Sequence, residues 1–351
     1  MPTSMPTLLE RLSNARGVSG NEGDVRDILI EAIRGLADWH RVDPLGNLIA
    51  FKKARGTRAR SVPKVMVAAH MDEVGLLIVH HESSGQLRFH KVGGIDDRIL
   101  LSKVVLIGKD QIPGVIGVKP VHLLKQKERD QVVDVENMSI DIGARSKMEA
   151  EGVVKIGDYA SFATKFGEMG EGVVKGKALD DRSGCAILVE LLKGDFPLDL
   201  FAVFTVQEEV GARGAQVAAY AVEPTAAFVL ESTVCDDLPK TRDVSPTTRL
   251  GQGAAITIAD NSMIADRRLV DLLMETADAN RIPYQIKQPL KGGTDAGRIH
   301  TAKEGVPSAV VAVPTRYIHA PVSLLSLRDF ESATALMLKT LGQLRGLDDL
   351  H

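Results

Sequence analysis

The feature that most constrains this fold is an alternation of apolar strand-like runs with helical segments, which is interrupted once. The run KVMVAAH at 64–70 is almost continuously apolar, the pattern of a strand buried on both faces of a parallel sheet. From about residue 171 the alternation resumes, with strands expected at 198–206, 225–232 and 306–314 and helices at 181–193, 212–219, 267–280 and 327–344. This order predicts an α/β fold, a mostly parallel sheet with helices on both faces.

The interruption between residues 74 and 164 has a different character. It contains short β-rich pieces separated by Gly and Pro at the spacing of strands and turns, without a convincing amphipathic helix. We therefore expect an inserted antiparallel β domain at 74–164, either barrel-like or sandwich-like. The α/β domain would then comprise residues 1–73 and 165–351.

Composition excludes several classes of protein. The 351 residues include 43 Lys and Arg against 46 Asp and Glu, whereas a nucleic-acid-binding protein usually has a basic excess. No apolar run approaches the roughly 20 residues of a membrane span. Glu10 and Arg11 interrupt the N-terminus before a signal-peptide core can form. Because two cysteines cannot form a disulfide framework, we expect the reducing cytoplasm as the location.

Potential metal ligands gather where the predicted strands end. His70 closes the strand at 64–70, and Asp72 follows two residues later, where its carboxylate can hold the far nitrogen of the imidazole. Asp180 and Asp181 mark a strand-to-helix junction, where one carboxylate can cap the helix while the other faces a cation. Each feature also has a plain structural explanation, as a structural histidine or a helix cap.

Three more strand ends carry side chains of the same kind. Glu208 and Glu209 follow one strand, Glu231 ends the next, and His319 follows a late strand. Open α/β sheets bind ligands beyond the carboxyl ends of their strands, so these side chains are expected to meet. Two imidazoles with three or four carboxylates suit Zn²⁺, Co²⁺ or Mn²⁺ but exceed the ligand set of one catalytic zinc. The set predicts two divalent ions that share a carboxylate.

The other motifs favour no competing chemistry. The Gly-rich segment KGGTDAGRIH at 291–300 matches neither the Walker pattern nor the dinucleotide fingerprint. We expect it to form a tight turn that lines the site, with Thr294 or Asp295 capping a short helix. The sequence contains no GxSxG or HExxH, which disfavours a covalent nucleophile and a single-zinc peptidase helix.

Six segments, in this order and spacing, resemble the di-metal aminopeptidases of metallopeptidase family 42, the glutamyl-aminopeptidase-like or tetrahedral aminopeptidases. They are AAHMDEVG, ALDDRSG, QEEVGARGA, VLESTVCDD, GGTDAGRIH and TRYIHAP, and the resemblance covers essentially the whole chain. It implies a catalytic domain at 1–73 and 165–351 and a dimerisation domain at 74–164. It also implies dimers that build a larger hollow particle, which admits only peptides able to enter.

The resemblance assigns the metal ligands as follows: Asp180 bridges both ions, His70 and Glu231 complete one site, and Glu209 and His319 complete the other. It makes Glu208 the general base, gives Asp72 the task of orienting His70, and implies a cis peptide between Asp180 and Asp181. The family often has Asp at the position of Glu231. Glu occurs there in a branch whose members have sometimes been labelled endoglucanases.

These features predict a metal-dependent aminopeptidase that removes N-terminal residues from short peptides. The metals polarise the scissile carbonyl and lower the pKa of a bridging water, and Glu208 takes the proton of that water and passes it to the leaving amine. An N-acyl amino-acid deacylase on the same site is one alternative. An endoglucanase is a second, although a glycosidase needs two carboxyls flanking its bond and gives the histidines no task.

Overall fold

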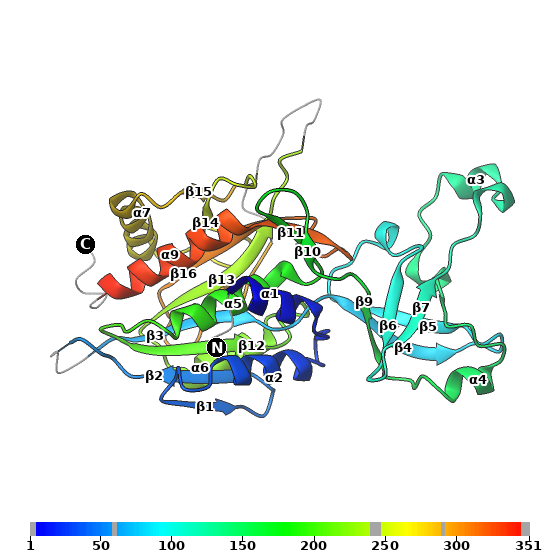
Figure 1. Ribbon diagram of the computed structural model, residues 1–351, viewed down its shortest axis with the longest axis horizontal. Coiled ribbons are helices and arrows are strands. Elements are labelled where there is room, and N and C mark those ends of the chain that lie inside the picture. Colours follow the sequence, from blue (N-terminus) through cyan, green and yellow to red (C-terminus); the bar gives the residue numbers. More distant parts are fainter. Residues whose placement is uncertain (1–4, 58–61, 239–246, 289–291, 345–351) are drawn as a thin grey trace.

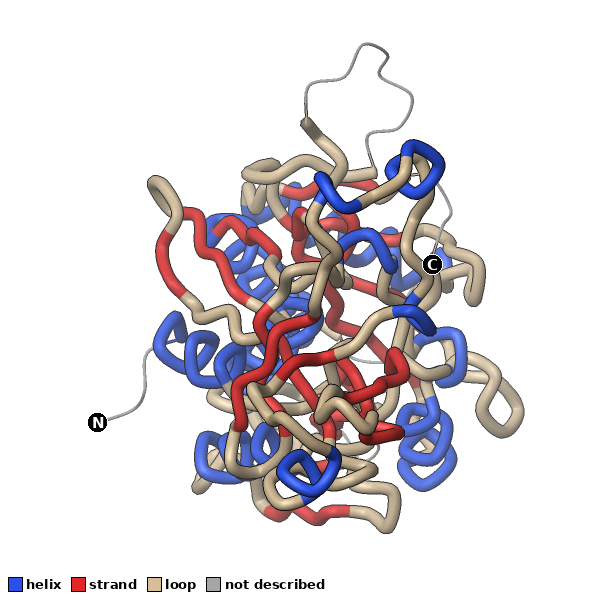
Figure 2. Tube along the Cα trace, turned by 90° about the vertical axis from the view of Figure 1, so that its right-hand side faces the viewer, coloured by secondary structure: helices blue, strands red, loops and turns tan. Residues whose placement is uncertain are grey.

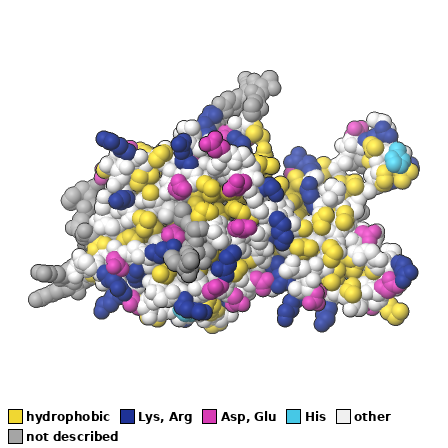
Figure 3. Space-filling view, viewed as in Figure 1, with side chains coloured by type: hydrophobic (Ala, Val, Ile, Leu, Met, Phe, Trp, Pro, Cys, Tyr) yellow, Lys and Arg dark blue, Asp and Glu magenta, His cyan; other side chains and the backbone are white. Residues whose placement is uncertain are grey.

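The computed structural model describes residues 5–57, 62–238, 247–288 and 292–344, in two bodies that lie side by side in Figure 1. The larger body is a sheet covered by helices, and the smaller body is a β-barrel. Figure 2 looks from the side of the barrel and places its strands in front of the larger body. Figure 3 shows acidic and basic side chains interspersed over the face seen in Figure 1.

An 11-stranded sheet forms the centre of the larger body. Its central strands run parallel, in the order β12 (Asp199–Thr205), β3 (Lys64–His70), β13 (Ala226–Val234) and β16 (Ser308–Arg316). The flanking strands pair antiparallel, namely β2 (Leu48–Lys52) and β1 (Trp39–Val42) on one side and β17 (Ser323–Ser326), β11 (Val173–Gly176) and β10 (Gly167–Glu168) on the other. Strand β14 (Ala254–Thr257) pairs antiparallel with β16 and parallel with β15 (Tyr284–Ile286). The sheet is therefore mixed, with its parallel pairing in the centre.

The register of the parallel centre brings several strand ends to one level. Thr205 at the end of β12 pairs with His70 at the end of β3. Ala68 pairs with Val229 of β13, so two residues further along these parallel strands His70 comes level with Glu231. The strand at 64–70 has the bounds that its apolar pattern predicts, and its residues from Val65 onward are buried.

Helices cover the sheet on both faces, as the alternation predicts. Helix α5 (Leu179–Leu191) packs on β3 and β13 and also contacts α1 (Met5–Asn14) and α9 (Leu327–Gln343). Helix α6 (Arg213–Val222) packs on β12 and contacts α8 (Ala296–Ile299). Helix α2 (Gly23–Ala32) adjoins α1, and α7 (Arg267–Asn280) adjoins α9. In the described ranges, no helix combines the length and apolar character that crossing a membrane requires.

The smaller body is a closed antiparallel barrel, which settles the choice between barrel and sandwich. Its strands follow the order β4 (Gly75–His81), β5 (Leu87–Val92), β8 (Ile140–Asp141), β7 (Ile112–Ile116), β6 (Val104–Ile107) and β9 (Tyr159–Phe162). The barrel has a hydrophobic core of its own, which includes Leu76, Ile107 and Phe162. The short helices in this part of the chain are η1 (Asp97–Ile99), η2 (Val121–Leu123), α3 (Gln126–Arg129), η3 (Val135–Asn137) and α4 (Lys147–Glu151). Helix α3 lies on an arm that projects from the barrel (Figure 1).

Candidate metal centre

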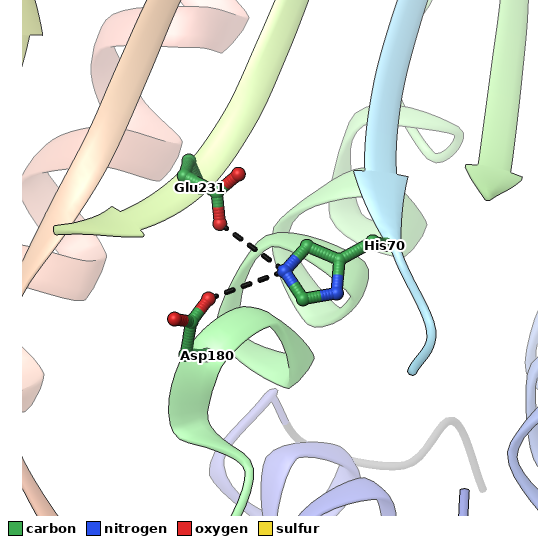
Figure 4. Close-up of side chains that lie close together, drawn as sticks. All are labelled: His70, Asp180 and Glu231. Carbon is green, nitrogen blue, oxygen red and sulfur yellow. Dashed lines mark hydrogen bonds and ion pairs between the residues drawn. The ribbon is translucent and has the colours of Figure 1, made fainter. Parts of the chain in front are cut away.

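His70 ends β3, and its ring points at two carboxylates from neighbouring elements (Figure 4). Its Nε2 atom lies 3.2 Å from Oδ1 of Asp180 and 3.3 Å from Oε1 of Glu231. Glu231 comes from β13, and Asp180 from the start of α5. All three side chains are buried, and their potential ligand atoms lie within 4.8 Å of one another. An imidazole with two carboxylates at this spacing fits a divalent cation.

A second cluster shares Asp180 with the first. The Nε2 atom of His319 lies 3.5 Å from Oδ2 of Asp180 and 3.3 Å from Oε2 of Glu209. His319 belongs to the loop between β16 and β17, and Glu209 to the segment between β12 and α6. These three ligand atoms also lie within 4.8 Å of one another. The two oxygens of Asp180 therefore face different histidines, which is the arrangement of a carboxylate shared by two cations.

The neighbouring carboxylate of Asp181 belongs to neither cluster. Its Oδ1 atom accepts the backbone N–H of Gly184 at 2.9 Å and the hydroxyl of Ser183 at 3.4 Å, so it holds the first turn of α5. A cis peptide bond joins Asp180 to Asp181, as the family resemblance implies. Asp181 thus bonds to the first turn of the helix, while Asp180 contacts the histidines of both clusters.

Asp72 is fully buried and organises the residues around it. Its Oδ1 atom lies 3.4 Å from Nδ1 of His70 and accepts the backbone N–H of Glu208 at 3.0 Å. Its Oδ2 atom accepts the backbone N–H of Glu209 at 3.1 Å and the hydroxyl of Ser19 at 2.6 Å. Burial raises the pKa of Asp72, but these contacts outweigh it and hold the pKa below its usual value. One carboxylate therefore orients the ring of His70 and fixes the backbone of both glutamates.

The ring of His319 is held from the other body of the molecule. Its Nδ1 atom lies at hydrogen-bonding distance, 3.1 Å, from the carbonyl oxygen of Gly94, which follows β5 of the barrel. A metal-binding histidine commonly donates its second N–H to a carboxylate or carbonyl, which fixes the ring and leaves the other nitrogen for the ion. His70 and His319 both fit this arrangement, with Nε2 directed into a cluster.

Glu208 lines the same cavity as His70, Asp180, Glu231 and His319, but it belongs to neither cluster. Burial is the main reason why the pKa of Glu208 lies well above its usual value. His70 opposes this shift, whereas the nearby Glu231 adds to it. A half-buried carboxyl with a raised pKa beside a candidate metal centre is suited to accept a proton from water.

The surroundings raise the pKa of several candidate ligand groups. Burial raises the pKa of Glu231 to about 8 and that of Glu209 to about 7. Burial lowers the pKa of His319, but Asp180 and Glu209 outweigh it and raise the value to about 9. A cation that binds here must displace protons from these groups, so the donor set fits a metal whose uptake releases protons.

A buried ion network behind the clusters was not singled out by the sequence analysis. Glu73 accepts hydrogen bonds from Nζ of Lys177 at 2.7 and 2.8 Å and from the backbone N–H of Gly17 at 3.0 Å. The guanidinium of Arg182 is fully buried, lies 3.5 Å from Glu73 and donates to the carbonyl of Leu12 at 2.6 Å. Glu73 and Arg182 each lie within a segment that also carries a candidate ligand, and this proximity is the signal that could have pointed to them.

Imidazole and carboxylate clusters lie at the carboxyl ends of the parallel central strands, with a half-buried glutamate beside them. This arrangement is that of a metal-dependent hydrolase of the open α/β class. The model of the M42 glutamyl aminopeptidase family matches residues 46–336, and the chain belongs to this family.

Relatives match over almost the whole chain. The lysyl aminopeptidase of Pyrococcus furiosus is 33% identical over 349 residues, which cover 97% of this chain and 98% of that relative. A TET aminopeptidase from the marine sediment archaeon Thaumarchaeota archaeon SCGC AB-539-E09 has a TM-score of 0.93 and 37% identity, with 98% and 97% of the two chains covered. The TET1 peptidase of Pyrococcus horikoshii, which can assemble into a tetrahedron or a large octahedral shell, has a TM-score of 0.85 and 36% identity, with 97% and 100% covered.

These matches confirm the predicted family and activity. The chain is a metal-dependent aminopeptidase, a hydrolase of peptide bonds, and its fold is the predicted α/β sheet with an inserted barrel. The alternatives of an N-acyl amino-acid deacylase and an endoglucanase are not favoured by the family match.

Proposed function

We propose that this chain removes N-terminal residues from short peptides by means of two divalent ions, one in each cluster. Asp180 would be shared by both ions, His70 and Glu231 would complete one site, and Glu209 and His319 would complete the other. The observation that carries this proposal is the position of Asp180, whose two oxygens lie 3.2 and 3.5 Å from Nε2 atoms of different histidines. Imidazole and carboxylate ligands without thiolate suit Zn²⁺ and Co²⁺ first, with Mn²⁺ as a further candidate.

Ions bound in these clusters would polarise the scissile carbonyl and lower the pKa of the attacking water. Glu208 accepts the proton of this water and then donates it to the leaving amine. The raised pKa of Glu208 and its place on the same cavity wall as the candidate ligands support this role. Asp72 acts through its neighbours, since it orients His70 and anchors the backbone N–H of Glu208.

We further propose that residues 74–164 form a dimerisation domain and that the dimers build a larger hollow particle. Exposed apolar side chains on this part of the chain support the proposal. Val104 and Val115 on the barrel strands expose 47% and 46% of their surface, and Val121 and Leu123 before the α3 arm expose 63% and 60%. The related TET1 peptidase of Pyrococcus horikoshii forms closed shells, and a similar shell here would restrict substrates to short peptides. Light scattering should find a large particle, and a fully active monomer would contradict this part of the proposal.

The catalytic proposal is tested by removal and return of metal. Chelation should abolish hydrolysis of aminoacyl p-nitroanilides, and addition of Zn²⁺, Co²⁺ or Mn²⁺ should restore it to different extents. An N-acetylated substrate, which lacks the free amine, is the matched control and should remain uncleaved. Full activity in the chelated protein, or equal turnover of the acetylated substrate, would contradict an aminopeptidase mechanism that depends on these clusters.

A further inference from the structure

The cavity beside the metal centre extends well beyond the ligands. It has a volume of about 350 Å³ and opens from His70, Asp180 and Glu231 toward a second group of residues. That second group forms a wall of hydroxyl-bearing, small and aliphatic residues, including Ser232, Thr233, Val234, Thr247, Thr294 and Ile318. The volume lies within the range of small-molecule sites and suits a single amino-acid residue.

One charged side chain stands in this wall. Apart from the metal ligands and Glu208, Lys287 is the only charged residue among the described residues that line the cavity. It is half-buried, and no described carboxylate forms an ion pair with its ammonium group. Among the described residues, the cavity wall away from the metal centre therefore carries one positive charge and no negative charge.

The wall around Lys287 is held together by hydrogen bonds from several segments. The backbone N–H of Lys287 donates to the carbonyl of Ile256 at 3.0 Å, which continues the parallel pairing of β15 with β14. The next residue, Gln288, donates its backbone N–H to the carbonyl of Thr247 at 3.0 Å. The hydroxyl of Thr247 in turn donates to the carbonyl of Val234 at 2.5 Å. Lys287 thus projects from a fixed backbone rather than from a free loop.

A second cavity can accommodate the part of a peptide substrate that follows its first residue. It has a volume of about 540 Å³ and is lined by Glu208, Glu209 and His319 together with residues such as Gly211 and Arg298. Glu208 and His319 border both cavities. A peptide that is cut after its first residue has one short end and one long end. The smaller cavity suits the single N-terminal side chain, and the larger one suits the leaving peptide.

We propose that Lys287 determines specificity and selects substrates whose N-terminal residue is acidic. The inference rests on the proposed aminopeptidase function, because it places that residue beside the metal centre in the smaller cavity. A glutamate side chain there meets the ammonium group of Lys287 in a charge-assisted hydrogen bond, which is stronger than a bond between neutral groups. A basic N-terminal side chain meets a like charge, and an aliphatic one leaves Lys287 without a partner.

The test compares glutamyl with glutaminyl p-nitroanilide, which have nearly the same shape and differ in charge. These substrates have no C-terminal carboxylate, so an effect of Lys287 on the far end of a peptide does not contribute. The full-length, metal-loaded protein should show a kcat/KM for the glutamyl substrate at least about tenfold above that for the glutaminyl one, a modest value for one charged contact. Leucyl and lysyl p-nitroanilides should be poorer still.

Two variants and a control separate specificity from folding. Lys287→Met should lose the preference for the glutamyl substrate, mainly through KM, while Lys287→Glu should shift the preference to the lysyl substrate. Lys339→Met, on the exposed face of α9 and outside the cavity, should leave every ratio unchanged. The reversal in Lys287→Glu is a gain of activity on one substrate, which an unfolded variant does not produce.

The outcomes distinguish this inference from the function on which it rests. If the wild-type protein cleaves leucyl or lysyl substrates better than glutamyl ones, Lys287 does not select acidic residues, although the protein remains an aminopeptidase. Unchanged substrate ratios in both Lys287 variants also overturn the inference. If no aminoacyl substrate is cleaved at any metal concentration, the proposed function and the inference both fail.

Discussion

Substitution of the two adjacent glutamates tests most sharply which of them binds metal and which acts as the general base. Glu209 places Oε2 at 3.3 Å from Nε2 of His319 and belongs to a candidate metal cluster, whereas Glu208 belongs to neither cluster. Glutamine keeps the size of glutamate and one acceptor oxygen but cannot take up a proton from water. Glu208→Gln should therefore fold, retain both metal ions and bind substrate, yet lose catalysis.

The structure sets the size of the expected loss. The backbone N–H of Glu208 is anchored by Asp72 at 3.0 Å, and this contact does not involve the side chain, so the substitution leaves the clusters in place. The loss is that of a general base, about 10²–10⁴-fold in kcat, with KM and metal content nearly unchanged. Glu209→Gln removes a charged ligand instead. It should lower the metal affinity of the second cluster by about 10–100-fold or more, because the loss of a residue that only supports a metal ligand already has an effect of that size.

The assay measures kcat, KM and metal content for both variants at several metal concentrations. Added metal should partly restore Glu209→Gln and should leave Glu208→Gln inactive. If Glu208→Gln loses an ion and recovers with added metal, the two roles are exchanged and the reasoning from the clusters is wrong. If both variants keep wild-type kcat, neither glutamate serves the reaction.

Three further predictions concern protons, positioning and stability. Metal affinity should rise as the pH passes the pKa values of Glu209, about 7, and Glu231, about 8, because a cation must displace the protons of both carboxyls. Calorimetry that finds no proton release on metal binding would contradict this prediction. Asp72→Asn should weaken metal binding about 10–100-fold, measured by competition with a chelator, since it disturbs the orientation of a ligand. Lys177→Met leaves the buried Glu73 with Arg182 as its remaining cationic neighbour among the described residues. The variant should lower the free energy of unfolding by about 3 kcal/mol, and a denaturant midpoint equal to that of the wild type would refute this.

Much of the fold was predictable because the apolar pattern reports burial directly. The strand at 64–70 is apolar almost throughout, since β3 lies between β12 and β13 in the middle of the sheet. The barrel was predicted only as one of two β architectures, because closure depends on pairings such as β4 with β9, which join residues far apart in the chain. The boundaries at 74 and 164 and the cytoplasmic location stay predictions.

The strand-end rule was informative for the site because parallel strands in register bring their ends together. It placed His70, Asp180 and Glu231 at one edge, and the structure brings these side chains together, although their roles as ligands stay predictions. The rule did not decide which of Asp180 and Asp181 faces the cluster. That choice depends on the backbone at the start of α5, where Asp181 accepts the N–H of Gly184 and Asp180 faces the two histidines.

Other features depend on long-range contacts that the sequence does not display. The sequence analysis expected Thr294 or Asp295 to cap a helix. Thr294 accepts the N–H of Ala296 at 3.3 Å, whereas Asp295 accepts a hydrogen bond from the hydroxyl of Thr205, which lies at the end of β12. Lys287 is also distant in sequence from every ligand and enters the cavity only because β15 pairs at the edge of the sheet.

The central claim is that Asp180 is shared by two ions, and counting metal in active protein tests it most directly. Chelated protein is titrated with Zn²⁺ while activity and bound metal are measured by hydrolysis and by elemental analysis. We predict two ions per chain at full activity, one ion in His319→Ala, and weakened binding of both ions in Asp180→Asn. A fully active wild-type protein that holds a single ion per chain would contradict the shared role of Asp180.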